Sequence, residues 1–126
     1  MTRTVKLMIV DDSDDMRQAI AAAAKKIPGL NIQVVAEASD GLQAVQTISA
    51  RAPDLVALDL NMPRMDGFEA AAKLSAKVKG LRILVISAAT DHTSMMRSFN
   101  AGAHAFLAKP FTQQDFQEKV LAVLED

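Results

Sequence analysis

The sequence predicts an α/β fold, in which a parallel sheet of five strands is covered by helices on both faces. Five short apolar runs alternate with segments whose apolar residues recur at helical spacing. These runs are mostly continuously apolar, with at most one polar residue in each, as is typical of strands buried on both faces of a parallel sheet. Right-handed crossovers place the carboxyl ends of all the strands at one edge, which is where open α/β sheets bind ligands.

The composition favours one domain of common size. The chain has 126 residues, half of them hydrophobic, so we expect residues 1–126 to form a single domain. Lys and Arg total 14 against 15 Asp and Glu, a balance that gives no argument for binding nucleic acid or a membrane. The absence of cysteine excludes disulfides, thiolate zinc sites and thiol nucleophiles. No apolar run is long enough for a membrane span or placed as in an export signal, so we expect a cytoplasmic protein.

The first strand is expected over residues 5–10, directly before Asp11 and Asp12. Ser13 is the expected N-cap of the first helix, because its hydroxyl can accept a hydrogen bond from a free amide of the first turn. The Pro-Gly pair at 28–29 is expected to end this helix.

Two more strand and helix pairs follow. The second strand is expected over residues 32–36, and Asp40 caps the second helix. The third strand is the apolar run 55–58, which is too short for an ordinary helix. Asp66 caps the third helix, and Gly80 ends it.

The last two pairs complete the alternation. The fourth strand is expected over residues 81–86, and a helix over about 91–101 follows it. This helix has few apolar residues, so we expect it to be the least firmly held of the five. The fifth strand is expected over residues 103–107, and Thr112 with Asp115 begins the final helix.

Carboxylate, hydroxyl or ammonium side chains that could bind a ligand or react stand at the ends of four of the five expected strands. The second strand, at the edge of the sheet, has no such side chain with an apparent chemical role. Three carboxylates that meet at one edge repel one another unless a divalent cation lies between them. Oxygen ligands without His or Cys suit Mg²⁺ or Mn²⁺, and Mg²⁺ commonly shares its coordination with phosphate oxygens. The residues are Asp11 and Asp12 after the first strand, Asp59 after the third, Ser87 at the end of the fourth and Lys109 after the fifth.

With a metal bound, Asp59 is a plausible nucleophile, because carboxylates can form aspartyl-phosphate intermediates. The Lys109 ammonium and the Ser87 hydroxyl would then surround the phosphoryl oxygens together with the metal. No residue is placed as a general base for hydrolysis. The pattern therefore favours a phosphorylated Asp59 as the output itself.

Four motifs occur in order along the chain: Val10-Asp11-Asp12-Ser13, residues 58–67, Ile86-Ser87-Ala88, and Ala101-Gly102-Ala103 followed by Lys109-Pro110-Phe111. Together they resemble the receiver domain of two-component response regulators, and the resemblance spans essentially all 126 residues. It implies a flavodoxin-like, doubly wound sheet with strand order 2-1-3-4-5. Residues 12–13 and 61–63 resemble single-domain, chemotaxis-type receivers, whereas residues 34–41 resemble receivers attached to DNA-binding domains, and neither likeness decides between the two.

The resemblance implies a role for each site residue. Asp59 would accept a phosphoryl group from a histidine kinase or a histidine phosphotransfer protein. Asp12, Asp59 and the backbone carbonyl of Asn61 would bind Mg²⁺, and Asp11 would act mostly through bound water. Lys109 would pair with the phosphoryl group, and the bond between Lys109 and Pro110 would be cis.

The resemblance also implies how the signal is read. Ser87 would move to hydrogen-bond the phosphoryl oxygens, and Phe106 would turn inward to fill the space it leaves. Phe106 stands where many members have Tyr, so only the packing half of this switch is available. The face formed by the fourth helix, the fifth strand and the fifth helix would then change its affinity for a downstream effector protein. Asn61 and Ala89 are small enough to leave water access, which favours a short-lived phosphorylated form.

Three other interpretations stay open at this point. A Mg²⁺-dependent aspartyl-phosphate phosphatase needs a second acidic residue two positions after its nucleophile, and position 61 is Asn. A scaffold that is never phosphorylated is disfavoured by the complete set of acidic residues. The chain could also be a receiver excised from a longer DNA-binding regulator. We expect a switch rather than a turnover enzyme, with no direct nucleic acid or membrane binding, as a monomer or a weak phosphorylation-linked dimer.

Overall fold

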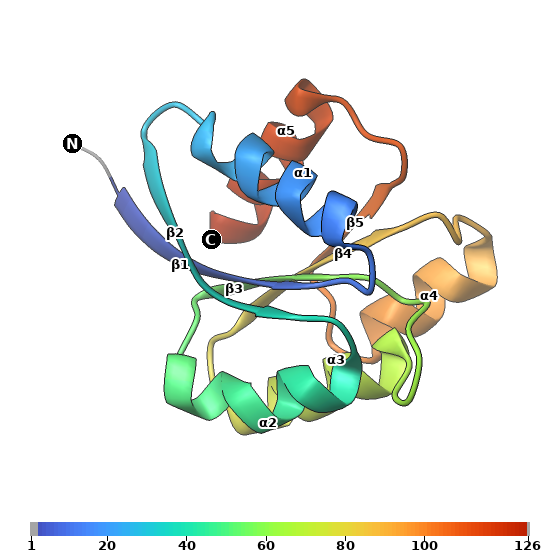
Figure 1. Cartoon of the computed structure of the whole chain (residues 1–126). Helices are drawn as coiled ribbons and strands as arrows, with labels where there is room; N and C mark the ends of the chain where they lie inside the picture. Colours follow the sequence, from blue (N-terminus) through green and yellow to red (C-terminus); the bar gives the residue numbers. More distant parts are fainter. Residues whose placement is uncertain (1–2, 126) are drawn as a thin grey trace.

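The computed structural model describes residues 3–125 and has the expected α/β architecture. Its five strands are all parallel and lie in the order β2-β1-β3-β4-β5, which confirms the predicted topology (Figure 1). Each strand is followed by one helix. The elements are β1 (Arg3–Val10), α1 (Asp14–Lys25), β2 (Leu30–Ala38), α2 (Gly41–Arg51), β3 (Leu55–Leu58), α3 (Gly67–Lys77), β4 (Arg82–Ser87), α4 (His92–Asn100), β5 (Ala105–Ala108) and α5 (Gln113–Leu124).

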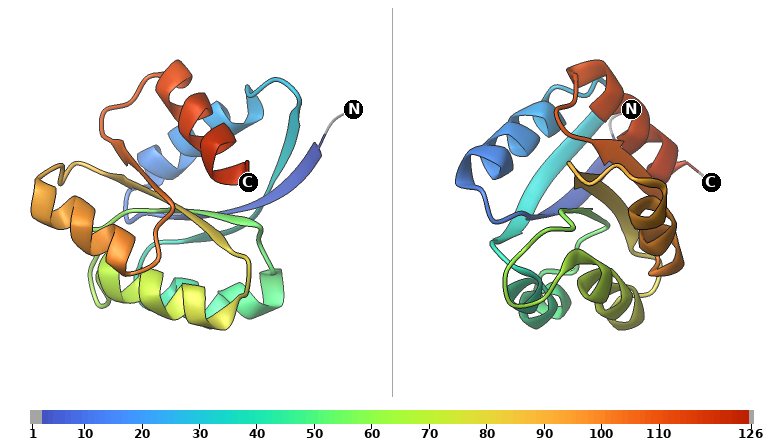
Figure 2. Two further views of the ribbon diagram at one scale, coloured as in Figure 1. Left: turned by 180° about the vertical axis from the view of Figure 1, so that it is seen from behind. Right: turned by 90° about the vertical axis from the view of Figure 1, so that its right-hand side faces the viewer.

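The sheet separates two hydrophobic cores. Helices α1 and α5 cover one face, and α2, α3 and α4 cover the other (Figures 1 and 2). Ile9, Ile20 and Phe116 belong to the first core, whereas Met8 and Leu74 belong to the second. Every residue of the central strand β3 is buried, as its uninterrupted apolar run predicts. Among residues 3–125 no helix has the length and apolar character needed to cross a membrane.

The helix starts follow the predicted capping chemistry, and Asp91, which was not predicted as a cap, caps the fourth helix in the same way. At each of the five helices the N-cap side chain accepts a hydrogen bond from the backbone amide three residues later. Parallel strands with short connections put all five helix N-termini at the same edge as the carboxyl ends of the strands, on the right in Figure 1. The N-caps are Ser13, Asp40, Asp66, Asp91 and Thr112.

Four of the five strands differ from the sequence prediction in their boundaries. Strand β4 covers Arg82–Ser87 instead of residues 81–86, β2 ends two residues later than predicted, and β5 ends one residue later. Strands β1 and β2 are longer than predicted, because their first residues pair from Arg3 and Leu30 onward. Strand β5 begins at Ala105 rather than at residue 103. The reason is that the Ala103 amide still donates to the Ser98 carbonyl at the end of α4, at 3.0 Å.

Of the five helices, α4 has the fewest buried residues. Ser98 is its only buried residue, while Met96 and Phe99 are 47% and 41% exposed. The Arg97 guanidinium lies 3.9 Å from the centre of the Phe68 ring of α3, which adds a cation–π contact between the two helices. The thin apolar face predicted for this helix is therefore confirmed.

A close backbone approach fixes the loop between β3 and α3. The Gly67 amide donates to the Leu60 carbonyl at 2.9 Å. A Cβ atom at Gly67 would lie 2.5 Å from both the Asp59 carbonyl oxygen and the Leu60 Cα. Only glycine therefore allows α3 to begin this close to the end of β3.

We predict that Gly67→Ala destabilises the protein by about 3 kcal/mol or more, since two backbone positions must shift to admit the methyl group. Urea unfolding followed by circular dichroism measures this loss. Gly80→Ala is the matched control: Gly80 has a φ of +78° but open space around it, so only the left-handed backbone costs energy, about 1 kcal/mol. Equal losses in the two variants would contradict the close approach.

Candidate functional site

Three carboxylates converge at the carboxyl end of the two central strands. Asp11 and Asp12 directly follow β1, and Asp59 directly follows the neighbouring strand β3, whose end is tied to β1 by a 2.9 Å hydrogen bond from the Asp59 amide to the Val10 carbonyl. One oxygen from each of the three carboxylates lies within 4.8 Å of the others. Asp11 and Asp59 are buried, whereas Asp12 is exposed. The parallel topology thus assembles the acidic cluster that the sequence predicts.

Lys109 supplies the cation at this cluster. Its Nζ lies 2.8 Å from an Asp11 carboxylate oxygen and 3.6 Å from an Asp59 carboxylate oxygen. The peptide bond between Lys109 and Pro110 is cis. Since the ammonium is closer to Asp11, one positive charge is shared between two buried negative charges.

This arrangement perturbs the pKa of Asp59. Burial raises the pKa of Asp59 above its ordinary value of 3.8, and the negative charge of Asp11 raises it further. The Lys109 ammonium and the Asn61 amide lower the pKa but do not offset the burial. A divalent cation would supply the missing positive charge, and the all-oxygen donor set fits Mg²⁺ or Mn²⁺.

Ser87 and Phe106 lie on the two strands beside the cluster. Ser87 ends β4 and is fully buried, and its hydroxyl accepts a 3.1 Å hydrogen bond from the Ala89 amide. The Ser87 carbonyl accepts from the Lys109 amide at 3.0 Å, which ties the ends of β4 and β5 together. Phe106 is only 7% exposed. Its ring therefore already lies inward in this structure, whereas the resemblance implied a ring that turns inward on phosphorylation.

A groove opens between α4, β5 and α5, next to the Phe106 ring. It has a volume of about 290 Å³ and is lined by both apolar and charged side chains. The face to which the resemblance assigns the output is therefore hollowed rather than flat. The lining residues are Thr90, Met95, Phe106, Leu107, Ala108, Asp115, Glu118 and Lys119.

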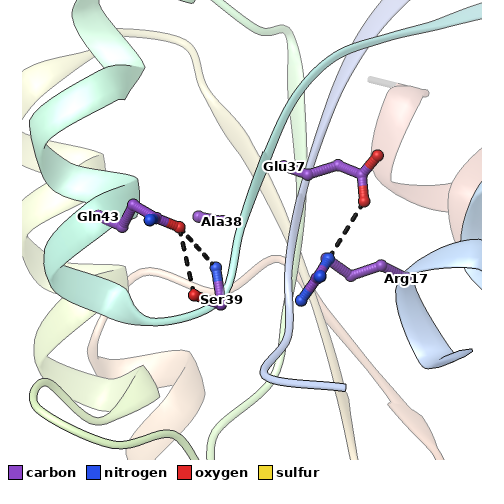
Figure 3. A pocket seen from close by; sticks show the side chains of 5 residues that line it. All are labelled: Arg17, Glu37, Ala38, Ser39 and Gln43. Carbon is purple, nitrogen blue, oxygen red and sulfur yellow. Dashed lines mark hydrogen bonds and ion pairs between the residues drawn. The ribbon is translucent and has the colours of Figure 1, made fainter. Parts of the chain in front are cut away.

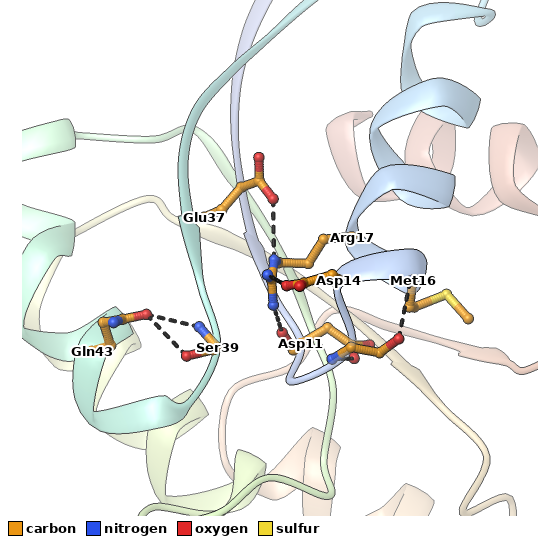
Figure 4. A network of polar contacts seen from close by, with 8 residues as sticks. Asp11, Asp14, Met16, Arg17, Glu37, Ser39 and Gln43 are labelled. Carbon is orange, nitrogen blue, oxygen red and sulfur yellow. Dashed lines mark hydrogen bonds and ion pairs between the residues drawn. The ribbon is translucent and has the colours of Figure 1, made fainter.

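The second strand, from which no chemistry was expected, supports the backbone beside the acidic cluster. The carbonyl of Ala38, the last residue of β2, accepts a 3.0 Å hydrogen bond from the Asp11 amide. Glu37 of β2 pairs with the Arg17 Nε at 3.1 Å. Another Arg17 nitrogen donates to the Asp11 carbonyl at 2.5 Å, and the Asp14 carboxylate also contacts this guanidinium (Figure 4). The edge strand thus holds the backbone of Asp11 from outside the acidic cluster.

Sequence reasoning missed Arg17. Its side chain lies between α1 and β2, beside a small hollow of about 150 Å³ (Figure 3). On the other side of this hollow the Gln43 amide oxygen accepts from the Ser39 amide at 2.8 Å. The one signal in the sequence is an arginine in the second turn of the helix that follows the acidic pair, which also fits a solvated helix face.

We predict that Arg17→Met costs about 1.5–3 kcal/mol of stability, because the carbonyl of Asp11 loses a bond from a charged donor. Glu37→Gln removes only a half-exposed ion-pair partner and should cost about 1 kcal/mol or less. Urea unfolding at neutral pH compares the two variants. Equal losses would contradict the dominance of the carbonyl bond over the ion pair.

We predict that Asp59→Asn stabilises the metal-free protein at pH 7. A carboxyl group whose pKa is raised by folding destabilises the folded state at every pH above that raised pKa, because its ionised form prefers the unfolded chain. The gain should shrink as the pH falls through the raised value towards 3.8, and added Mg²⁺ should also reduce it. Urea unfolding from pH 7 to acid, with and without chelator, tests this. Asp15→Asn, at an exposed position of α1, serves as the control.

Comparisons with known proteins agree with this geometry. The family model for the response regulator receiver domain matches residues 7–121. The chemotaxis protein CheY of Listeria monocytogenes is 38% identical over 121 residues, which cover 96% of each chain. The signal receiver domain of the putative response regulator NarL from Mycobacterium tuberculosis superposes with a TM-score of 0.84 at 33% identity over 94% of each chain.

One of the solved structures similar to this chain is part of a protein complex. One chain of the CheX–CheY complex of Borrelia burgdorferi, determined with BeF₃ and Mg²⁺, superposes with a TM-score of 0.88 at 27% identity, and the match covers 97% of this chain and 90% of the other. The acidic cluster, the lysine after β5 and the match over residues 7–121 lead to one conclusion: the chain belongs to the receiver domain family of two-component response regulators.

Proposed function

We propose that this receiver domain is a switch in which Asp59 accepts a phosphoryl group from a histidine kinase or a histidine phosphotransfer protein. The observation that carries the proposal is the buried Asp59 carboxylate beside two other carboxylates and 3.6 Å from the Lys109 ammonium. In the transfer, the bond between phosphorus and the donor nitrogen breaks as a bond to an Asp59 oxygen forms. Lys109 and the hydroxyl of Ser87 then bind the phosphoryl oxygens.

The metal ligands follow from the same cluster. Asp12, Asp59 and the backbone carbonyl of Asn61 would hold Mg²⁺, or Mn²⁺ in its place, and Asp11 would act mostly through bound water. The ion supplies positive charge to the transferring phosphoryl group. Asp11 has a further task, because its carboxylate holds the Lys109 ammonium at 2.8 Å and so keeps it beside Asp59.

The output would follow from a shift between two arrangements of β4 and β5. Ser87 would move to donate its hydroxyl to a phosphoryl oxygen, and this movement would draw it away from the Ala89 amide, from which the hydroxyl accepts a hydrogen bond in this structure. The inward position of Phe106 is then the arrangement that phosphorylation favours, and the groove between α4, β5 and α5 changes its affinity for an effector protein. The weakly buried α4 suits such a movement.

The similar proteins support this assignment of partners. The Borrelia CheY was crystallised with CheX, so a chemotaxis-type receiver with a protein partner is one precedent. We propose a cytoplasmic protein that acts through protein contacts in chemotaxis-type signalling, as a monomer or a weak phosphorylation-linked dimer, with no direct binding to nucleic acid. Asn61 is exposed, Ala89 is half-buried and both are small, which would favour water access to a phosphorylated Asp59 and a short-lived phosphorylated form. No observation favours a phosphatase, since Asn61 lacks the acidic group that such an enzyme needs.

We predict that acetyl phosphate and Mg²⁺ add one phosphoryl group to the wild-type protein and none to Asp59→Asn. Amide NMR shifts should begin near Asp59 and spread to Ser87, α4 and Phe106, and beryllofluoride should give the same pattern. Asp54→Asn, which changes an aspartate at the other end of β3, should respond like the wild type. No shift in the wild type, or equal shifts in Asp59→Asn, would overturn the proposal.

A further inference from the structure

A strained turn lies within the loop that carries the candidate metal ligands. The Met65 amide donates to the Pro63 carbonyl at 2.8 Å, which closes a three-residue turn centred on Arg64. Arg64 has a φ of +67°, and such turns with a positive central φ are rare and strained. A non-glycine residue keeps this conformation only where other contacts compensate for its cost.

The compensating contact comes from the turn between β2 and α2. The Arg64 Nε lies 3.0 Å from an Asp40 carboxylate oxygen, and a second guanidinium nitrogen contacts the same oxygen. The other Asp40 oxygen accepts from the Gln43 amide at 2.8 Å as the N-cap of α2. The Asp40 side chain is only 4% exposed, so its charge is held in place by two sets of donors. The Gln43 amide and then the Arg64 guanidinium lower the pKa of Asp40, so both partners stabilise its ionised form.

The two turns are also in contact through their backbones. A Cβ atom at Gly41 would lie 2.7 Å from the Met65 carbonyl oxygen, so the turn after β2 touches the loop after β3 directly. The far end of this loop is fixed by the Gly67 amide, and its near end by the Asp59 amide. Asn61 lies between these fixed points, three residues before Arg64.

We propose that the ion pair between Arg64 and Asp40 is a positioning contact that holds the loop after β3 in the shape in which the Asn61 carbonyl meets the metal. Among the described residues, the guanidinium of Arg64 makes its hydrogen bonds to Asp40 and not to the candidate metal ligands. It acts through the Pro63–Met65 turn, and Asp40 acts through Arg64. This inference rests on the proposed function, because it concerns the metal site of that function.

Arg64→Gly separates positioning from stability. Glycine adopts a φ of +67° without strain, so this variant removes the ion pair and the backbone cost together. We expect its resistance to urea to be equal to or higher than that of the wild type, while its affinity for Mg²⁺ falls by about 10-fold, as for other groups that orient metal ligands. Because the chain has no Trp or Tyr, the affinity is best measured by amide NMR titration with MgCl₂ alone. Faster hydrogen exchange of the Met65 amide in the metal-free variant is a second readout.

Asp40→Asn tests the other partner. Asparagine is as good an N-cap as aspartate, so α2 keeps its start while the charge opposite Arg64 is lost. We expect Asp40→Asn to weaken Mg²⁺ binding about as much as Arg64→Gly, and the double variant to be no weaker than either single one. Lys73→Gln is the matched control, because it removes a lysine from an exposed ion pair with Glu69 on α3 and should leave the affinity unchanged.

The outcomes distinguish this inference from the function on which it rests. If the wild type binds Mg²⁺ and Arg64→Gly binds it equally well, the inference is wrong and the proposed function stands. If the losses in the two single variants add in the double variant, the two residues act independently and the inference is also wrong. If the wild type itself does not bind Mg²⁺, both the proposed function and the inference are overturned.

Discussion

The site depends on an electrostatic imbalance that the fold itself creates. Parallel strands bring Asp11 and Asp59 to the same buried point, and the single ammonium of Lys109 lies closer to the first than to the second. Burial, and then the negative charge of Asp11, raise the pKa of Asp59 although Lys109 lowers it, so the ionised form of this carboxylate is poorly stabilised in the folded protein. A bound cation or a transferred phosphoryl group changes this balance directly. Binding and modification can therefore act on the conformation through charge.

The surrounding backbone is tied closely enough to maintain that imbalance. The amide of Asp11 is bonded to β2, its carbonyl to Arg17 and its carboxylate to Lys109. The loop after Asp59 is held by the close approach of Gly67. By contrast, α4 buries only Ser98, so the part of the molecule expected to respond is also the part with the least packing to lose. The segments around this edge of the sheet therefore differ in how tightly they are packed and bonded.

Much of this arrangement could be predicted from the sequence, because it depends on local signals. Apolar runs located the strands, and capping residues located the helix starts. Parallel topology alone then required Asp59 and Lys109 to meet at one edge. What could not be predicted are contacts made by long side chains across elements, above all those of Arg17 and Arg64. Such contacts depend on the spacing between packed elements and on a backbone conformation at Arg64 that its residue type does not favour.

The capping residues have a consequence for behaviour in acid. All five helices start at the edge that holds the acidic cluster, and three of the five caps are aspartates. The Gln43 amide lowers the pKa of Asp40, and the Ser94 hydroxyl lowers that of Asp91. Their stabilisation is present above the ordinary pKa of 3.8 and disappears as the pH falls through the lowered values. Acid thus relieves the crowding at Asp59 while it releases the helix starts around it, so that unfolding in acid would begin at the signalling end of the domain.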